Sequence, residues 1–152
     1  MAFYLLIGIH PVNDAFVVPF TAAVARASGG LLKLAGEPVV VAGTSISSRA
    51  FSVNVENGCN GLETALLLAA AVLAFPASWR QKLAGFALGF LSIELVNLVR
   101  VASLFWVGAH RPGWFGPAHT VVWQSLVVLT GLGLFVGWAT LVAKHRARPD
   151  PL

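Results

Sequence analysis

Long apolar runs, separated by short polar connections, fill the second half of the chain. They cover about residues 61–75, 82–107 and 118–143. An α-helix rises about 1.5 Å per residue, so about 20 apolar residues cross the roughly 30 Å hydrocarbon core of a membrane. Each run is near or above this length, and the first is the shortest. We therefore predict three membrane helices in this half of the chain.

The hydrophobic pattern of the first third is less regular. Residues 2–12 are mostly apolar, and we interpret them as a short N-terminal membrane segment. No basic residue precedes them and no small-residue cleavage motif follows, so a cleaved signal peptide is not indicated. Residues 15–35 carry Arg26 and Lys33 on an otherwise apolar helix, which favours an interfacial amphipathic helix over a tilted membrane helix. Residues 37–56 are rich in β-branched residues and partly alternate between apolar and polar, which predicts a small β-hairpin outside the membrane.

These elements together predict an all-α integral membrane protein of one domain, residues 1–152. We expect a bundle of about four transmembrane helices, with the interfacial helix and a small extracytoplasmic β-hairpin. The composition agrees, because 57% of the residues are hydrophobic and 11% are charged, against about 25% charged residues in soluble domains. The net charge of +4 comes from scattered Lys and Arg residues. This distribution indicates contact with anionic lipid headgroups and not with nucleic acid.

Basic residues predict how the chain is oriented in the membrane. Arg80 and Lys82 lie in the connection between the first two long runs, and the tail at 144–152 carries three more basic residues. Lys and Arg concentrate in short cytoplasmic segments, so we expect both regions to be cytoplasmic. Cys59 and the start of the third run then face the outer side. Four tryptophans lie near predicted helix ends, as an interfacial aromatic belt would: Trp79, Trp106, Trp114 and Trp138.

The only cysteine, Cys59, lies in the sequence Asn57-Gly-Cys-Asn-Gly-Leu-Glu63, where a loop leads into the first long run. A single cysteine forms no internal disulfide, and most free cysteines are small buried apolar residues. The N-terminus of a helix, however, lowers the pKa of a thiol through its dipole and free N–H groups. We therefore expect a reactive thiol at Cys59.

Two other ionisable residues can reach the same level of the membrane. Arg100 lies inside the second long run, where an ionisable residue by default faces the bundle interior and has a function, and its long side chain can extend towards the interface. His119 opens the third run. We predict that Cys59, Arg100 and His119 meet at the outer surface and form a catalytic set. His110 is also on the outer side, but it lies in a loop where a solvated histidine is ordinary.

Three polar neighbours are candidates for support of this set. Glu63 follows Cys59 by one helical turn, and it either pairs with Arg100 structurally or orients Arg100 or His119. Asn97 lies one turn before Arg100 on the same helix face. Asn60 directly follows the cysteine.

A thiol, an imidazole and a guanidinium are the parts of an acyl-transfer site. The thiolate attacks a peptide carbonyl, the histidine moves protons, and the arginine stabilises the oxyanion. The sequence contains no metal-ligand cluster and no phosphate-cradling glycine loop, so we expect no metal and no cofactor. Water or an amine can resolve the thioester, and the residues do not choose between a protease and a transpeptidase.

At these residues the sequence resembles the exosortase/archaeosortase family of membrane cysteine transpeptidases, most of all the short exosortase H type. The resemblance covers about residues 50–138 and rests on four segments taken in order: 57–63, 75–82, 97–101 and 114–124. It implies that Cys59 is the nucleophile and that Arg100 and His119 complete the catalytic set. The chain is shorter than the larger members of the family, and its first helix is truncated.

The resemblance also implies a substrate. Family members cleave exported proteins near a C-terminal sorting signal, which consists of a short motif, a hydrophobic helix and a basic tail, and are thought to join the new C-terminus to an envelope acceptor. For the H type the signal contains an Ile-Pro-Thr-Leu-like motif and a Trp-Gly pair. The implied location is the bacterial inner membrane, as a multi-pass protein with its active site facing the periplasm. The expected partners are this protein substrate and membrane lipids.

Two alternatives remain open from the sequence. The first is a non-enzymatic membrane subunit, in which an Arg100–Glu63 ion pair is structural and Cys59 is inert. The second is a small channel or transporter, in which Arg100 lines an anion path. Both alternatives predict a function that survives the loss of Cys59.

Overall fold

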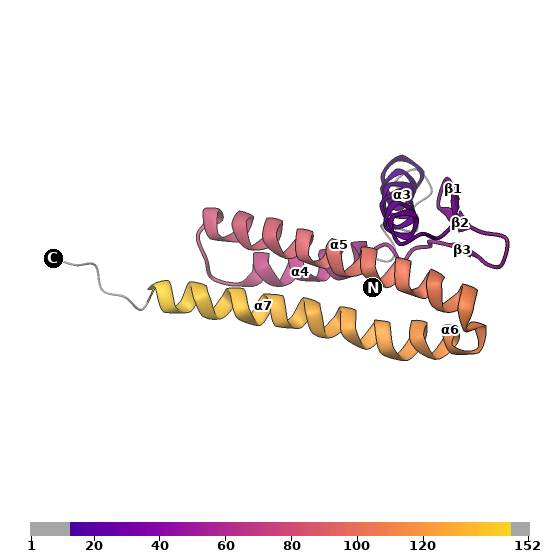
Figure 1. Ribbon diagram of the computed structural model, residues 1–152. Helices are drawn as coiled ribbons and strands as arrows, with labels where there is room; N and C mark the ends of the chain where they lie inside the picture. The colour runs from indigo at the N-terminus through magenta and orange to yellow at the C-terminus, as the bar shows by residue number, and fades with distance from the viewer. Residues whose placement is uncertain (1–12, 147–152) are drawn as a thin grey trace.

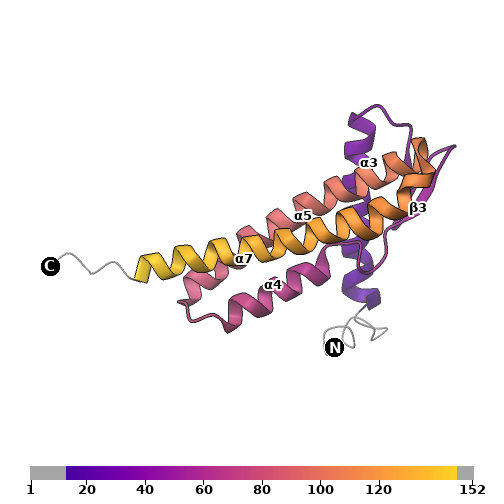
Figure 2. The same ribbon diagram turned by 90° about the horizontal axis from the view of Figure 1, so that it is seen from below.

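A computed structural model describes residues 13–146 as a helical bundle with a small sheet at one end (Figure 1). Helices α4, α5 and α7 run side by side in Figures 1 and 2, and the sheet lies near the end of the bundle where α5 finishes. The elements in chain order are η1 (Asn13–Val17), α3 (Val18–Leu34), β1 (Val40–Ala42), β2 (Ser45–Ser47), β3 (Ser52–Asn54), α4 (Leu62–Ala74), α5 (Trp79–His110), η2 (Pro112–Trp114), α6 (Phe115–Pro117), η3 (Ala118–Trp123) and α7 (Gln124–Arg146).

Three stretches of the described residues are long and apolar enough to cross a membrane: Asn13–Leu34, Trp79–His110 and Pro112–Arg146. This confirms a mostly helical membrane protein. The predicted helices 82–107 and 118–143 lie within the last two stretches. Helix α4 has 13 residues, which is about 20 Å and less than the hydrocarbon thickness. The predicted segment 2–12 lies outside the described residues.

Helix α3 lies across the bundle. Figure 1 views it almost along its axis while α5 and α7 run across the picture, and Figure 2 shows it lengthwise. It belongs to the apolar stretch that is long enough to span a membrane, and the interfacial placement of residues 15–35 stays a prediction. A buried apolar cluster joins α3, the sheet and α5, and it includes Ala25, Ile46 and Phe105. This cluster fixes the sheet against the C-terminal half of α5.

The sheet has three antiparallel strands in the order β1-β2-β3, so the predicted two-stranded hairpin is wrong in its strand count. The two predicted strands do not pair with each other. Both pair with β2, at Val41↔Ile46 and Ile46↔Val53. The middle strand β2 was not predicted, and two of its three residues are serines. Ile46 is fully buried, and the burial of this one side chain in the apolar cluster outweighs the polar character of its neighbours.

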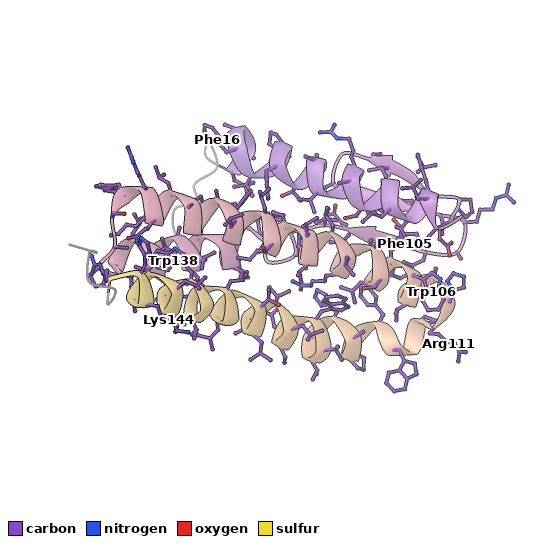
Figure 3. All side chains as sticks on the ribbon, turned by 60° about the vertical axis from the view of Figure 1, so that its left-hand side comes forward. Phe16, Phe105, Trp106, Arg111, Trp138 and Lys144 are labelled. Carbon is purple, nitrogen blue, oxygen red and sulfur yellow. The ribbon has the colours of Figure 1, made fainter. Side chains whose placement is uncertain are left out.

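Close contacts between helices depend on small residues in the bundle. Gly85 and Gly89 lie one turn apart on α5, where they face the Trp138 ring and Leu68 respectively. The indole Nε1–H of Trp138 donates a hydrogen bond to the Gln81 carbonyl over 3.1 Å. Figure 3 shows Trp138 and Lys144 at one end of the bundle and Trp106 and Arg111 at the other. Small residues that allow helices to approach closely are typical of membrane bundles.

We expect the substitution Gly85→Val to destabilise the bundle. The added methyl groups would overlap the Trp138 ring, and such overpacking costs about 1–3 kcal/mol. Thermal unfolding of the purified protein in detergent measures the effect as a lower melting temperature. Gly133→Val is the matched control, since a Cβ atom there meets no atom within 4 Å. Equal melting temperatures for the two variants would show that the α5–α7 contact is absent.

Candidate active site

The three residues predicted to form a catalytic set lie together. The Sγ atom of Cys59 is 3.1 Å from Nε2 of His119. Arg100 Nη2 is 3.8 Å from the same sulfur, and Arg100 Nη1 donates to the Gly58 carbonyl over 3.4 Å. The structure therefore brings these three side chains together, and their role as a catalytic set stays a prediction.

Cys59 lies in a tight loop before α4 and not in the helix itself. Gly58 and Gly61 have φ values of 88° and 81°, a left-handed conformation that favours glycine. The Cys59 N–H donates to the Glu56 carbonyl over 2.9 Å. Helix α4 begins only at Leu62, with Gly61 as its N-cap. The thiol is thus fixed by the loop, two residues before the cap.

Asn60 attaches this loop to α3. Its side chain is almost fully buried, Nδ2 donates to Thr21 Oγ1 over 2.9 Å, and Oδ1 accepts from the Leu62 N–H. The Thr21 hydroxyl in turn donates to the Val17 carbonyl over 2.7 Å. Asn60 therefore supports the site by holding the backbone beside Cys59. The sequence did not identify Thr21, and its only signal was a polar residue on the apolar part of a helix.

Arg100 reaches the loop from the middle of α5 and is 2% exposed. Its two terminal nitrogens contact the sulfur and a carbonyl oxygen of the loop, and its Nε atom has no hydrogen-bond partner among residues 13–146. Neither carboxylate oxygen of the nearby Glu94 has such a partner in the described chain, so Glu94 does not hold Arg100. The guanidinium charge is directed at the loop that carries the thiol.

His119 is presented by the first turns of the last long helix, within the π-helical segment η3. Its ring is parallel to that of Phe115, with centroids 5.9 Å apart. The competing residue His110 is placed elsewhere. Its Nδ1 atom is 3.0 Å from the Trp106 carbonyl and its Nε2 atom is 3.6 Å from Glu37 Oε1. The structure therefore brings His119, and not His110, to the thiol.

Of the other two predicted supporting residues, Asn97 differs from expectation. Asn97 is fully buried, but neither amide atom has a hydrogen-bond partner among the described residues. The predicted polar contact with Arg100 is therefore wrong: the arginine extends towards the loop instead of along its own helix. Glu63 faces the loop, since a Cβ atom on Gly58 would lie 3.8 Å from Glu63 Oε2. Its role as an orienting or a structural acid stays a prediction.

The expected lowering of the thiol pKa is also wrong. Burial raises the pKa of Cys59, and the carboxylates of Glu56 and Glu63 add to the rise. The charge of Arg100 acts in the opposite direction and lowers this pKa. At neutral pH the thiol needs a base to remove its proton, and His119 is within hydrogen-bonding distance.

A cavity of about 540 Å³ opens beside the three residues. It is lined by the continuous segment 51–57, by residues 100, 101 and 104 of α5, and by Phe115 and His119 from the start of the last helix. Among residues 13–146 no group of three His, Cys, Asp or Glu side chains could hold a metal ion. The site therefore consists of a thiol, an imidazole and a guanidinium at the edge of a cavity that has room for a peptide.

The family model described as transmembrane exosortase (Exosortase_EpsH) matches residues 1–144. The chain belongs to this family. Neither a curated protein nor a solved structure matches it.

We expect the alkylation of Cys59 by iodoacetamide to depend on pH and on Arg100. The thiolate is the reactive form and burial raises the thiol pKa, so the rate should increase as the pH rises into the alkaline range. Removing the guanidinium in Arg100→Gln raises the pKa further, which slows alkylation at neutral pH and moves the rate profile to higher pH. Cys59 is the only cysteine, so mass spectrometry of the labelled protein reads this site alone. Arg49→Gln, at an exposed arginine between β2 and β3, is the control. An equal shift of the rate profile in this variant would refute the effect of the Arg100 charge on the thiol.

We expect Thr21→Val to weaken the attachment of the Cys59 loop. Valine has nearly the same shape but leaves the buried Nδ2 of Asn60 without its acceptor, which costs about 1–3 kcal/mol. Thermal unfolding in detergent should show the loss. Thr130→Val is the matched control, because the Thr130 hydroxyl bonds only to the Leu126 carbonyl of its own helix. Equal stability of the two variants would contradict this role of Asn60.

Proposed function

We propose that this exosortase-family protein is a membrane cysteine transpeptidase or peptidase. It cleaves exported proteins at their C-terminal sorting signals through a thioacyl intermediate. It then transfers the new C-terminus of the exported protein to an envelope acceptor. The observation that carries the proposal is the 3.1 Å approach of Cys59 Sγ to His119 Nε2, with Arg100 Nη2 3.8 Å from the same sulfur. The three side chains come from a loop and two separate helices, and they converge beside a cavity.

In the first chemical step His119 Nε2 accepts the proton of the Cys59 thiol while the sulfur attacks the scissile peptide carbonyl. The carbonyl oxygen becomes an oxyanion, and the permanent charge of Arg100 next to the sulfur stabilises it. The C–N bond then breaks, and the imidazolium donates its proton to the leaving amine. The products of this step are the C-terminal fragment and a thioester on Cys59.

In the second step an acceptor amine or water attacks the thioester. His119 removes a proton from the attacking group, the C–S bond breaks, and the thiol is regenerated with that proton. An amine gives a new amide bond and therefore transpeptidation, whereas water gives hydrolysis. We assign transfer to an amine as the physiological reaction.

The arrangement of the helices supports an outward-facing site. His119 lies near the start of the last long helix and contacts Cys59, whereas Lys144 lies in the last turn of that helix. Figure 3 shows Lys144 at the end of the bundle opposite Trp106 and Arg111. If the basic ends are cytoplasmic, as the positive-inside tendency predicts, the site faces the periplasm of a bacterial inner membrane. A substrate anchored by its own hydrophobic helix would present its motif at this level.

The test is co-expression with an exported reporter that ends in an Ile-Pro-Thr-Leu-like motif, a hydrophobic helix with a Trp-Gly pair, and a basic tail. We expect the wild type to shorten the reporter and Cys59→Ala to abolish the shortening, because the nucleophile is lost. Immunoblotting measures reporter size, and mass spectrometry of the new C-terminus distinguishes an acceptor from water.

Ser92→Ala is the control variant, since this exposed hydroxyl bonds only within α5. Shortening by Cys59→Ala at the wild-type level would exclude the thiol mechanism. A reporter that the wild type leaves intact would favour the non-enzymatic subunit, in which Arg100 and Glu63 form a structural ion pair.

A further inference from the structure

Strand β3 is an edge strand whose outer edge is not paired in the sheet. It pairs only with β2, in the order β1-β2-β3. The Val55 N–H donates to the Thr44 carbonyl and the Ser48 N–H to the Phe51 carbonyl, which identifies these as hydrogen-bonded pairs of the ladder. Hydrogen-bonded and non-hydrogen-bonded pairs alternate along antiparallel strands. The backbone N–H and C=O groups of Ser52 and Asn54 therefore point away from β2.

The side chains of Ser52 and Asn54 form hydrogen bonds across one face of the sheet, towards β2. Ser52 Oγ is 2.8 Å from Ser47 Oγ, and Asn54 Oδ1 accepts from Thr44 Oγ1 over 2.7 Å. Both partners lie at or beside β2. The outward backbone groups of Ser52 and Asn54 are thus not covered by their own side chains. They stay available to another chain.

This free edge opens into the cavity that contains the thiol. Every residue from Phe51 to Asn57 lines the cavity, together with Cys59, Arg100 and His119. Neighbouring side chains of a strand point to opposite faces of the sheet, so a cavity lined by all of them faces the edge of the strand. The edge leads along the chain from Ser52 directly to Cys59.

Exposed strand edges invite pairing with other chains, and proteins usually block or cover them. Here the edge is short and lies beside the candidate nucleophile. An extended peptide added to such an edge gains main-chain hydrogen bonds that do not depend on its side chains. The same bonds would hold its carbonyl groups at a fixed register relative to Cys59 Sγ.

We propose that the segment of the substrate around the scissile bond binds as a fourth strand on the free edge of β3. It exchanges main-chain hydrogen bonds with Ser52 and Asn54 and brings one carbonyl carbon to Cys59 Sγ. The proposal rests on the proposed function, because it specifies how the peptide substrate is held. The occupant is an extended polypeptide of either direction, and not a helix.

Disulfide cross-linking tests this proposal. Cys59→Ala removes the only cysteine, so Cys59→Ala/Asn54→Cys carries a single thiol beside the cavity and cannot process the substrate. It is co-expressed with the reporter described above, in a series with one cysteine at each consecutive position around the motif. Opposed residues of adjacent strands have Cα atoms about 4.5–5.5 Å apart, within the range that a disulfide bridges. Immunoblotting without reductant detects the cross-linked product.

We expect cross-links at alternate reporter positions and their loss at the positions between, because successive side chains of a strand face opposite sides. The strongest cross-link should mark the reporter residue opposite position 54. Moving the cysteine to Ser52 should move this maximum by two positions, and the direction of the move gives the strand direction. Val40→Cys in the same Cys59→Ala background is the matched control: Val40 is exposed on β1, away from the cavity. The control should give no periodic pattern.

Cross-links at all consecutive positions, the same pattern with Val40→Cys, or no cross-links would overturn the added strand. The wild type separates this failure from failure of the proposed function. Thiol-dependent shortening of the reporter without periodic cross-links would support the proposed enzyme and refute the added strand. Periodic cross-links without shortening by the wild type would support the added strand and refute the proposed catalysis.

Discussion

A buried arginine needs polar groups around its charge, and Arg100 obtains them from a loop that is distant in sequence. Its terminal nitrogens contact the Gly58 carbonyl and the Cys59 sulfur. The cost of burying an unpaired charge is several kcal/mol, so the loop and the middle of α5 depend on each other. The position of the thiol follows from this dependence. The same charge that the loop stabilises also lowers the pKa of the thiol against the effect of burial.

The loop is held from its other side by α3. Asn60 connects it to Thr21, and the apolar cluster around Ile46 and Phe105 joins α3 to the sheet and to α5. A helix that lies across the bundle thus contributes to a site whose chemistry comes from other elements. The small sheet connects α3 with the loop, and it places the edge of β3 beside the thiol.

The bundle and the end that carries the site have different physical characters. Helices α4, α5 and α7 approach each other through glycines such as Gly85 and Gly89 and expose apolar side chains to the lipid. Glycines serve another purpose in the loop, where positive φ values at Gly58 and Gly61 turn the chain around Cys59. In this chain the helices provide a rigid support, and polar side-chain contacts locate the reacting groups.

The sequence by itself determined the class of the protein and the three residues of the candidate site. Apolar runs of membrane length, a lone cysteine between glycines, and an arginine inside a span are local signals that do not require coordinates. Tertiary structure decided what depends on pairing between distant segments. It added a middle strand because the Ile46 side chain is buried in the apolar cluster. It left the Asn97 amide without a hydrogen-bond partner among residues 13–146, and it raised the pKa of Cys59 through burial. It also identified Thr21 and the free edge of β3, since a side-chain partner in another helix and an unpaired backbone edge exist only after the chain has folded.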